Sequence, residues 1–361
     1  MKLLLLALAG LMAVTAFSCK DQHNNDVDWW LVYKMPKIKD GKIAGIENGH
    51  AFYYLDSKNP TFEASDIDLN SKSQAIAFTL QQYYNQKNDL SIFHAMYNDA
   101  DVDDIVLEDE LYANLTDLTS AKFGHTKETS ILCVTFFNQT DGIWFIHSVP
   151  KFPHSDFYEY PASGTIYGQS MLCLSLKYDQ LHKIGKQLYF NRPNFYSSQL
   201  PLKMSQDNPE LAKAIAGMYQ TGIPSSSVVD LVTKRGTKFR SFAKTAKFGK
   251  DLYDSLVAPD LKTPLKVETW RRGSPVPLDC SASYLVLDAL EIKVGTTPQF
   301  KFTQDHSKMA VSASKKRPYT CIGDINRMIS QFKRGGGTVC LRNFNVWQAY
   351  STLIEQTNSC G

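Results

Sequence analysis

Short apolar runs separated by turn-forming residues cover most of the chain, and their pattern predicts strands interspersed with a few helices. Strands are expected at 29–34, 51–55, 131–137, 142–149 and 283–294. Helices are expected within 72–86 and 168–188 and over 324–333 and 345–356, with Asp324 as the N-cap of the third. This alternation, without a GxGxxG motif or a P-loop, predicts an α/β chain of the mixed α+β type.

Proline and serine residues gather in the stretch 191–229, part of which is interpreted as a crossover between two halves. A length of 361 residues is compatible with one large domain or two smaller ones. We therefore expect an N-terminal half at 19–200 and a C-terminal half at 201–361.

The first 18 residues have the pattern of a secretory signal peptide. Lys2 precedes an apolar run that extends to Phe17, and Ala16 and Ser18 occupy the −3 and −1 positions of a cleavage site. The run is short for a membrane span, and no later stretch approaches about 20 apolar residues. We expect a soluble mature protein that begins at Cys19, passes through the secretory pathway and has no membrane partner.

Composition excludes several classes of protein. The hydrophobic fraction is 43% and the charged fraction 21%, which excludes disordered, collagen-like and coiled-coil chains. Lys and Arg number 39 against 36 Asp and Glu, so the chain is not a basic nucleic-acid coat protein. The chain has eight histidines, and most exposed histidines are charged below about pH 5.5, which favours a polyanionic partner in an acidic compartment.

Seven cysteines in a secreted chain predict disulfide bonds. Cys133 lies in the apolar run 131–137 and is the best candidate for an unpaired, buried thiol. The other six cysteines allow 15 pairings. No CxxC pair occurs, so no metal is expected. Two sequons make Asn114 and Asn138 candidates for glycosylation.

Two His-x-Lys motifs carry the candidate chemistry. They are His125-Thr126-Lys127 and His306-Ser307-Lys308. Residues i and i+2 of a strand share a face, so each motif would place an imidazole beside an ammonium group. The lysine would neutralise a phosphodiester, and the histidine would attack phosphorus or protonate the leaving oxygen. This scheme needs no metal and no cofactor. The alternative is a chance pair of surface features, because three-residue patterns are common.

The residues around these motifs carry a resemblance to a known family. They form blocks at 28–36, 124–127, 142–153, 160–164, 167–170, 306–308, 320–327 and 334–340. In these residues and their order the chain resembles the deoxyribonuclease II family over essentially the whole mature length. The resemblance implies one domain of the phospholipase D type. In such a pseudodimer, two similar halves each have a β-sheet flanked by helices, one His-x-Lys motif comes from each half, and the catalytic cleft lies between them.

The resemblance also implies an activity. Members of the family are endonucleases that cut DNA at acid pH without a divalent metal and leave 3′-phosphate and 5′-hydroxyl ends. They digest the DNA of apoptotic or engulfed cells in lysosomes, and some are secreted. The expected partner is therefore double-stranded DNA. No protein partner is required, and a homodimer is compatible with the pattern.

Site residues follow from the resemblance by position. The catalytic set is His125, Lys127, His306 and Lys308, with His147 and Asp324 as further catalytic candidates and Asn326 and Arg334 as substrate-binding candidates. Each further candidate has a plainer interpretation: a core histidine, a helix cap, or a constrained loop around Arg334. The implied disulfides are Cys19–Cys173, Cys280–Cys360 and Cys321–Cys340, which leave Cys133 free.

The implied mechanism forms a phosphohistidine. One histidine attacks phosphorus while the other, in its charged form, protonates the departing 5′-oxygen, so the rate has a bell-shaped pH dependence. We favour His125 as nucleophile and His306 as acid, although the near symmetry leaves the reverse open. Asp324 would orient one imidazole.

Two residues depart from the family pattern and keep other interpretations open. Glu128 stands where glycine is usual, and Met309 stands where tryptophan is usual. An acidic residue beside the first motif is compatible with a secreted, non-catalytic DNA-binding glycoprotein of the same fold. A third interpretation is a phosphodiesterase that acts on lipid or single-stranded nucleic acid.

Overall fold

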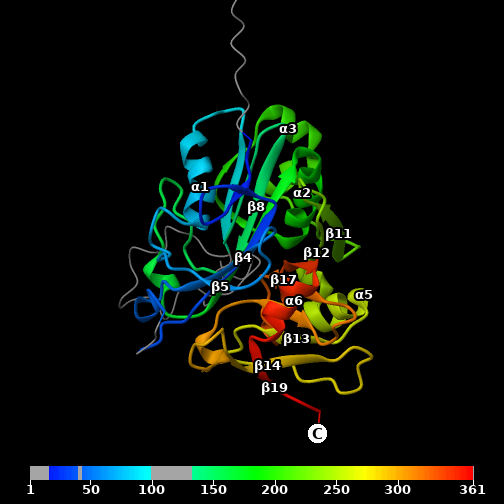
Figure 1. Ribbon diagram of the computed structural model, residues 1–361. Coiled ribbons are helices and arrows are strands. Elements are labelled where there is room, and N and C mark those ends of the chain that lie inside the picture. Colours follow the sequence, from blue (N-terminus) through cyan, green and yellow to red (C-terminus); the bar gives the residue numbers. More distant parts are fainter. Residues whose placement is uncertain (1–15, 40–42, 99–131, 361) are drawn as a thin grey trace, which may run out of the picture.

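The computed structural model describes residues 16–39, 43–98 and 132–360, and two β-sheets dominate this part of the chain (Figure 1). The strands of the first sheet lie in the order β10 (Asn194–Gln199), β6 (Phe93–Asn98), β7 (Leu132–Phe137), β8 (Asp141–His147), β9 (Gln169–Lys177), β3 (Trp29–Lys34), β4 (Phe52–Asp56) and β5 (Glu63–Ala64). All neighbours in this sheet are antiparallel.

The second sheet is built from later residues. Its strands lie in the order β11 (Ser226–Val232), β12 (Lys238–Lys244), β18 (Gly336–Arg342), β17 (Tyr319–Gly323), β16 (Met309–Ser312), β13 (Leu265–Glu268), β14 (Val286–Ile292) and β15 (Phe300–Lys301), and β19 (Ile354–Thr357) also pairs with β14. Only β13 and β14 run parallel among these pairs. A small ribbon of β1 (Cys19–Lys20) and β2 (Asp26–Val27) precedes the first sheet.

Six α-helices cover the sheets: α1 (Ala75–Gln86), α2 (Leu181–Asn191), α3 (Leu202–Asp207), α4 (Pro209–Ile215), α5 (Ala258–Leu261) and α6 (Phe344–Ser351) in the described residues. Gln74 starts α1 because its side chain accepts the backbone N–H groups of Ile76 and Ala77. Asn343 caps α6 in the same way. Figure 1 shows α1 beside the first sheet and α5 beside the second, at opposite sides of the molecule.

A hydrophobic core joins the two sheets. In β3, Trp29, Leu31 and Tyr33 point into this shared core, whereas Trp30 and Val32 point into an outer core beneath α1. Trp29 packs edge-on against Phe239 of the second sheet, with ring centroids 6.3 Å apart. Both faces of β3 are buried, which explains why its sequence is continuously apolar instead of alternating.

One carboxylate makes several hydrogen bonds between the halves. Asp28, which is 3% exposed, accepts the hydroxyls of Thr233 and Thr237 at 2.5 and 2.9 Å and the backbone N–H of Arg235 at 2.8 Å. Beside it, Lys234 forms an ion pair with Asp141 at 2.9 Å. The turn between β11 and β12 is therefore anchored to the first sheet by buried polar groups.

Three disulfides join Cys19 to Cys173, Cys280 to Cys360 and Cys321 to Cys340, the pairs that the resemblance implies. Cys133 is unpaired and buried in β7. Burial raises the pKa of its thiol to about 12. The thiol is therefore protonated at physiological pH and chemically inert.

The end of the expected signal peptide packs into the fold. Phe17 is fully buried and packs edge-on against Phe136, with ring centroids 5.0 Å apart. Its backbone N–H donates to Asp141 at 2.8 Å. A cut after Ser18 would remove this ring, and the boundary at 18 stays a prediction. None of the helices in the described part of the chain has the length and hydropathy of a membrane span.

The mixed α+β class is confirmed, together with the strands near 29–34, 51–55, 131–137 and 142–149 and the helix within 72–86. The division into halves at 200 stays a prediction. The first sheet takes its strands from residues before 200, and the second from residues after 225.

Three segments differ from expectation. In 168–188 the strand β9 precedes the helix α2. The apolar run of β9 forms a strand because it pairs with β3 on one side and with β8 on the other. Residues 324–333 form no α-helix. A 3₁₀ helix begins only at Ile329, and Asp324 is not a cap because its carboxylate accepts the backbone N–H of Gly337. In 345–356 the helix ends at Ser351 and β19 follows.

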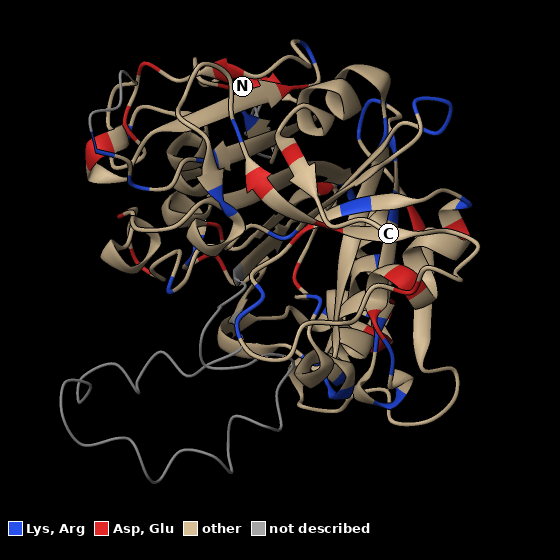
Figure 2. Cartoon of the chain, turned by 90° about the horizontal axis from the view of Figure 1, so that it is seen from below, with Lys and Arg blue, Asp and Glu red and all other residues tan. Residues whose placement is uncertain are grey.

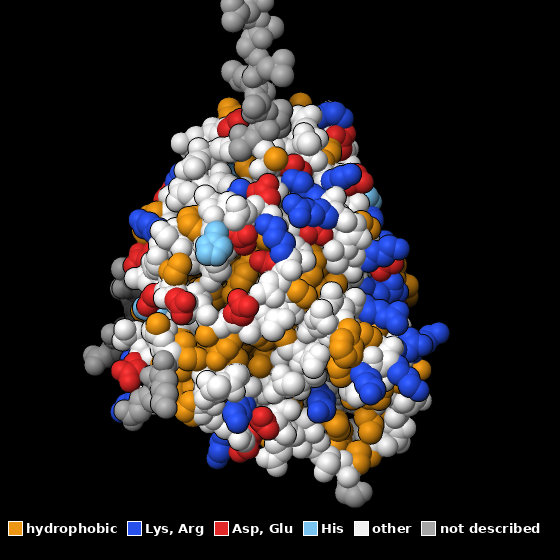
Figure 3. Space-filling model, in the orientation of Figure 1, with side chains coloured by type: hydrophobic (Ala, Val, Ile, Leu, Met, Phe, Trp, Pro, Cys, Tyr) orange, Lys and Arg blue, Asp and Glu red, His pale blue; other side chains and the backbone are white. Residues whose placement is uncertain are grey.

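Figure 2 shows acidic and basic residues interspersed over the cartoon of the chain. In the face shown in Figure 3, Lys and Arg gather along the edge where Figure 1 labels β11 and α5. This uneven distribution on a chain of small net charge is compatible with a polyanionic partner.

Candidate active site

The second His-x-Lys motif lies where the two halves meet. His306 follows a short 3₁₀ helix and precedes β16. Its backbone N–H donates to the carbonyl of Gly168 at 2.8 Å, and the N–H of Gly168 donates to Gln304 at 2.9 Å. A Cβ at Gly168 would lie 2.5 Å from a carboxylate oxygen of Asp305, so this close approach requires glycine. The motif is thus held by a loop of the first half.

Two aromatic rings enclose the imidazole of His306. Tyr167 stacks on it at 3.9 Å between centroids with an interplanar angle of 9°, and Trp270 packs at 4.2 Å on a tilted plane. The side chain is 5% exposed, and neither ring nitrogen has a hydrogen-bond partner within the described ranges. Two unpaired buried nitrogens are costly to stability, which is typical of a group kept for chemistry.

The surroundings of His306 keep it neutral. Burial lowers the pKa of His306 to about 2, and the positive charges of Lys308, Arg272 and Lys34 act in the same direction. The free protein therefore presents an uncharged imidazole at pH 5, the form that can donate an electron pair to phosphorus.

Lys308 belongs to the same site. It is buried, and its ammonium donates to the carbonyl of His306 at 2.8 Å. Its backbone N–H donates to the hydroxyl of Ser170, in β9 of the first sheet, at 3.2 Å. The cation is therefore held beside the imidazole by contacts within the motif and across the two halves.

A buried polar network supports the motif from the first half. Asp305 accepts the hydroxyl of Tyr33 at 2.5 Å and the N–H and hydroxyl of Ser307 at 2.8 and 2.9 Å. Lys34, fully buried, donates to the carbonyls of Thr165 and Tyr167 at 2.5 and 2.8 Å. Burial holds the pKa of this ammonium well below its usual range. Lys34 thereby holds the backbone of the loop whose tyrosine stacks on His306.

Trp270 connects the imidazole to further charges. The exposed guanidinium of Arg272 lies over its indole at 5.6 Å from the centroid. Glu268, two residues before Trp270, is buried, and neither of its carboxylate oxygens has a hydrogen-bond partner in the described chain; burial raises its pKa well above the usual value. Arg271 approaches it at 3.8 Å. Sequence reasoning gave Tyr33, Lys34, Trp270 and Glu268 no role, because their contacts to the motif are long-range.

His147 lies at the end of β8 in a different environment. Its ring is fully buried beside Phe145 and Phe152, with centroids 4.8 and 5.3 Å away. Nδ1 accepts the N–H of Val149 at 3.2 Å, and Nε2 has no partner among the residues described. Burial holds the pKa of the imidazole well below its usual range. Its ring neighbours differ from those of His306, and its catalytic role stays a prediction.

Asp324 lies between the halves at the end of β17. It lines a small cavity together with Tyr97, Cys133 and Trp144 of the first half. Burial raises the pKa of its carboxyl to about 7, against the effects of the Gly337 N–H and the positive charges of Lys244 and Lys308. The carboxyl of Asp324 is thus close enough to Lys308 for the positive charge of the lysine to lower its pKa.

The remaining candidates are placed as follows. Asn326 is 1% exposed in the segment after β17. Arg334 lines a larger cavity described below, and its carbonyl accepts the ammonium of Lys244 at 2.5 Å. Asn138 lies in the turn between β7 and β8, where its side chain accepts the N–H groups of Thr140 and Asp141. Its glycosylation and the binding roles stay predictions.

Several expectations lie outside the described residues. They are His125, Lys127, Glu128 and Asn114. Met309, by contrast, is fully buried in the shared core, where an apolar side chain is required. Groups of three or more His, Cys, Asp or Glu arranged to hold a metal ion were not found in the residues that the structure describes.

Comparison with known proteins decides the family. A profile described as Deoxyribonuclease II matches residues 18–360. The chain belongs to the deoxyribonuclease II family. Membership makes it a nuclease that acts on DNA. The family assignment also confirms the resemblance inferred from the two His-x-Lys motifs and their flanking blocks.

Relatives in the deoxyribonuclease II family match along almost their whole length. The chain is 53% identical to Deoxyribonuclease-2 of Caenorhabditis elegans, covering 99% of this chain and 97% of the relative. It is 36% identical to Plancitoxin-1 of Acanthaster planci, with 98% and 97% covered. Deoxyribonuclease-2-beta of Mus musculus is 34% identical, with 100% and 97% covered.

Proposed function

We propose that this protein is an acid endodeoxyribonuclease that hydrolyses DNA without a metal ion, leaves 3′-phosphate and 5′-hydroxyl ends and forms a phosphohistidine. The observation that carries the proposal is the environment of His306. A neutral imidazole with both nitrogens unpaired within the described residues lies beside the buried ammonium of Lys308. This pair provides a nucleophile and a cation for the phosphate charge.

The order of strands supports a pseudodimer. The first sheet contains β6, β7, β8 and β9 side by side, and the second contains β13, β16, β17 and β18 in the same sequence of antiparallel neighbours. The second motif precedes β16, and the first, at 125–127, precedes β7 in the chain. In chain order, each motif therefore precedes the second strand of its group of four, which is β7 in the first sheet and β16 in the second. Two copies of one ancestral half would have this arrangement.

The reaction proceeds in two displacements. A neutral imidazole nitrogen attacks phosphorus, the bond from phosphorus to the 5′-oxygen breaks, and a protonated histidine gives that oxygen its proton. Water then attacks phosphorus and gives a proton to the histidine that acted as the acid, the phosphorus–nitrogen bond breaks, and the 3′-phosphate leaves. Atoms and charge balance without a further reactant. Lys308 and Lys127 stabilise the negative charge in both steps.

The structure favours one of the two assignments that the sequence leaves open. Because His306 is neutral in the free protein, we assign it as the nucleophile and His125 as the acid, the reverse of the assignment favoured from sequence. An acid with an ordinary histidine pKa is protonated mainly below about pH 6.5, which gives a rate that rises toward acid pH.

The proposed site of action is the lysosome or the extracellular space, with DNA of apoptotic or engulfed cells as substrate. Three disulfides support passage through an oxidising compartment. Buried carboxyls with raised pKa values, including Asp324, keep their protons more readily in acid and so favour an acidic working environment.

One observation favours a second candidate function. Both nitrogens of His306 are buried, so a phosphodiester reaches them only if a covering group is displaced. A protein in which this displacement does not occur would bind DNA without cutting it. The second candidate is therefore a secreted, non-catalytic DNA-binding glycoprotein of the same fold.

Plasmid cleavage separates the two candidates. Wild type and His306→Ala are incubated with supercoiled DNA at about pH 5 in EDTA. Nicking by wild type alone, with 3′-phosphate ends on end-labelling, supports the nuclease proposal. Binding without nicking by either protein supports the non-catalytic candidate. Equal nicking by both proteins contradicts the role of His306.

A further inference from the structure

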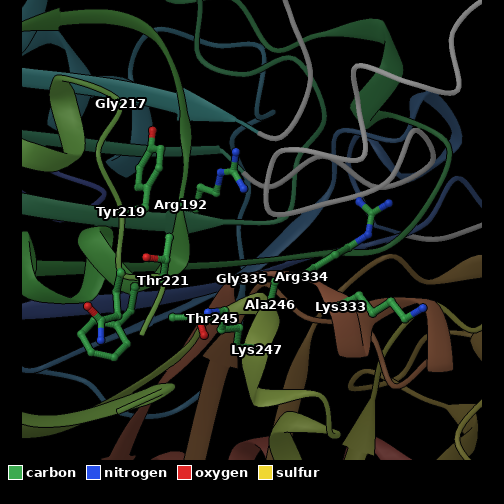
Figure 4. A pocket seen from close by; sticks show the side chains of 12 residues that line it. Arg192, Gly217, Tyr219, Thr221, Thr245, Ala246, Lys247, Lys333, Arg334 and Gly335 are labelled. Atoms are coloured by element: carbon green, nitrogen blue, oxygen red, sulfur yellow. The ribbon is translucent and has the colours of Figure 1, made fainter. Parts of the chain in front are cut away.

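A second cavity of about 330 Å³ lies on the junction of the two halves, apart from the rings that enclose His306. Figure 4 shows side chains from separate stretches of chain around it: Arg192 after α2, the loop 217–221, residues 245–247 after β12, and residues 333–335 before β18. The walls therefore come from both halves, as in a site formed by the completed fold.

The cavity is strongly cationic. Four of the residues that line it are Arg192, Lys247, Lys333 and Arg334, and no Asp or Glu lines it among the described residues. Arg192, Lys247 and Lys333 take part in none of the ion pairs found in the described chain. Several uncompensated cations around one hollow repel one another, and an anion relieves that cost.

Unpartnered polar atoms lie in the wall. The hydroxyl of Thr245, a residue that is 3% exposed, has no hydrogen-bond partner in the described ranges. The buried Nε of Arg192 also lacks one there, while its guanidinium lies over the ring of Tyr219 at 5.6 Å. A buried hydroxyl and a guanidinium donor without partners are the groups that a phosphate oxygen satisfies.

The loop that carries two of the cations is rigidly anchored. Lys244 is fully buried, and its ammonium donates to the carbonyls of Gln331 at 2.9 Å and Arg334 at 2.5 Å. A Cβ at Gly335 would collide with the carbonyl of Asn191, so this loop packs directly on the end of α2. The backbone segments that carry the cations of the two halves are therefore in contact before any ligand arrives.

The cavity is connected to the catalytic centre through the same loop. Gly337, two residues after Gly335, donates its N–H to Asp324. The pKa of Asp324 is in turn lowered by the positive charge of Lys308. Asn191 and Asp324 line the small cavity between the halves, and Arg192 and Gly335 line this larger one. A polyanion that occupies the catalytic centre therefore has a cationic cavity close beside it along the junction.

We propose that this cavity is a phosphate subsite that binds a phosphodiester of the substrate strand away from the bond that is cut. The inference rests on the proposed function for the identity of the ligand as DNA. Lys247 and Lys333, whose side chains are exposed, would bind the non-bridging oxygens, and Thr245 and Arg192 would donate from the wall. A duplex would then be held at two points, which orients the scissile phosphate at His306.

The test measures the salt dependence of DNA binding by Lys247→Gln/Lys333→Gln in a His306→Ala background, so that the DNA stays intact. Removing two phosphate contacts lowers the slope of log K against log salt by about 1.8 and raises Kd roughly tenfold at physiological salt. Lys315→Gln/Lys316→Gln is the matched control. It removes the same charge from the exposed turn after β16, whose lysines do not line the cavity, and it keeps the wild-type slope.

A second variant tests the wall without changing charge. Thr245→Val keeps the shape of the side chain and removes only the hydroxyl, and it raises Kd for DNA by a few fold. In the active background, the KM of Lys247→Gln/Lys333→Gln rises more for a 20-base-pair duplex than for a dinucleoside phosphate, because only the duplex reaches both sites.

The outcomes distinguish failure of the inference from failure of the proposed function. If wild type cuts plasmid in EDTA but the double variant has the same salt slope, Kd and KM as the control, the subsite is refuted. If wild type does not cut but the double variant loses slope relative to the control, the subsite stands and the catalytic proposal fails. Equal losses in the double variant and the control mean non-specific charge, which also overturns the subsite.

Discussion

The carboxylate of Asp28 gives a sharp test of how the two halves are joined. Asp28→Ala removes an acceptor that binds three donors of the turn 233–237 while leaving the surrounding backbone unchanged. Both Asp28 and Thr233 are 3% exposed, so water cannot easily replace the lost bonds. The turn belongs to the second sheet, and the substitution therefore weakens the contact between the halves.

The magnitude follows from the geometry. The three hydrogen bonds measure 2.5, 2.8 and 2.9 Å and end on a charged acceptor. Each such bond contributes about 1.5–3 kcal/mol, and bonds that share one acceptor are not additive. We expect Asp28→Ala to lower the free energy of unfolding by about 3–5 kcal/mol. Asp28→Asn, which keeps one acceptor oxygen, costs about half as much.

The assay is urea unfolding followed by fluorescence. The expected result is a lower midpoint with an unchanged slope, which reports stability and not a change in the denatured state. Asp66→Ala is the control, because Asp66 is exposed, and it should stay within about 0.5 kcal/mol of wild type. An Asp28→Ala midpoint close to that of the control would refute the account of the junction.

Three further changes give predictions of their own. Phe136→Ala removes a fully buried ring and should lower the free energy of unfolding by about 3–5 kcal/mol in the same urea assay; a change below about 1 kcal/mol would contradict the burial. Arg327→Met removes the guanidinium that lies 2.8 Å from Asp288 and 3.4 Å from Asp251 and should cost about 3–5 kcal/mol by urea unfolding. Burial raises the pKa of Asp324 from 3.8 to about 7, so its carboxyl stabilises the fold fully below pH 3.8 and loses this effect as pH rises through 7. Asp324→Asn should therefore remove about 1–2 kcal/mol of the stability gained between pH 7.5 and pH 5, allowing for its partial exposure, and an unchanged difference in Tm between the two pH values would contradict this.

The sequence predicted the parts that local pattern encodes. The apolar runs of β3, β7 and β8 identified strands, and the blocks around His306 identified the family and its expected disulfides. It did not predict that Trp270 and Tyr167 enclose the imidazole, or that Lys34 holds the tyrosine loop. Those contacts join residues of different strands and halves, and no local pattern encodes them.

The errors have the same origin. Asp324 has the sequence context of a helix cap, but its carboxylate bonds to Gly337 on a neighbouring strand, which replaces the local interaction. The apolar run of β9 does not by periodicity distinguish a buried strand from a helix, and only its two neighbours in the sheet decide between them. Long-range pairing overrides local propensity in both segments.

The central claim is that His306 attacks phosphorus, and mapping the covalent intermediate tests it most directly. Wild type is mixed with 5′-end-labelled and internally labelled DNA at about pH 5 in EDTA, quenched in alkali, digested and examined by mass spectrometry. The account predicts a phosphoryl group, carrying the fragment on the 3′-oxygen side, on the imidazole of His306, and its absence from His306→Ala. An adduct on His125 or His147 instead, or cleavage with no adduct on any histidine, would contradict the account.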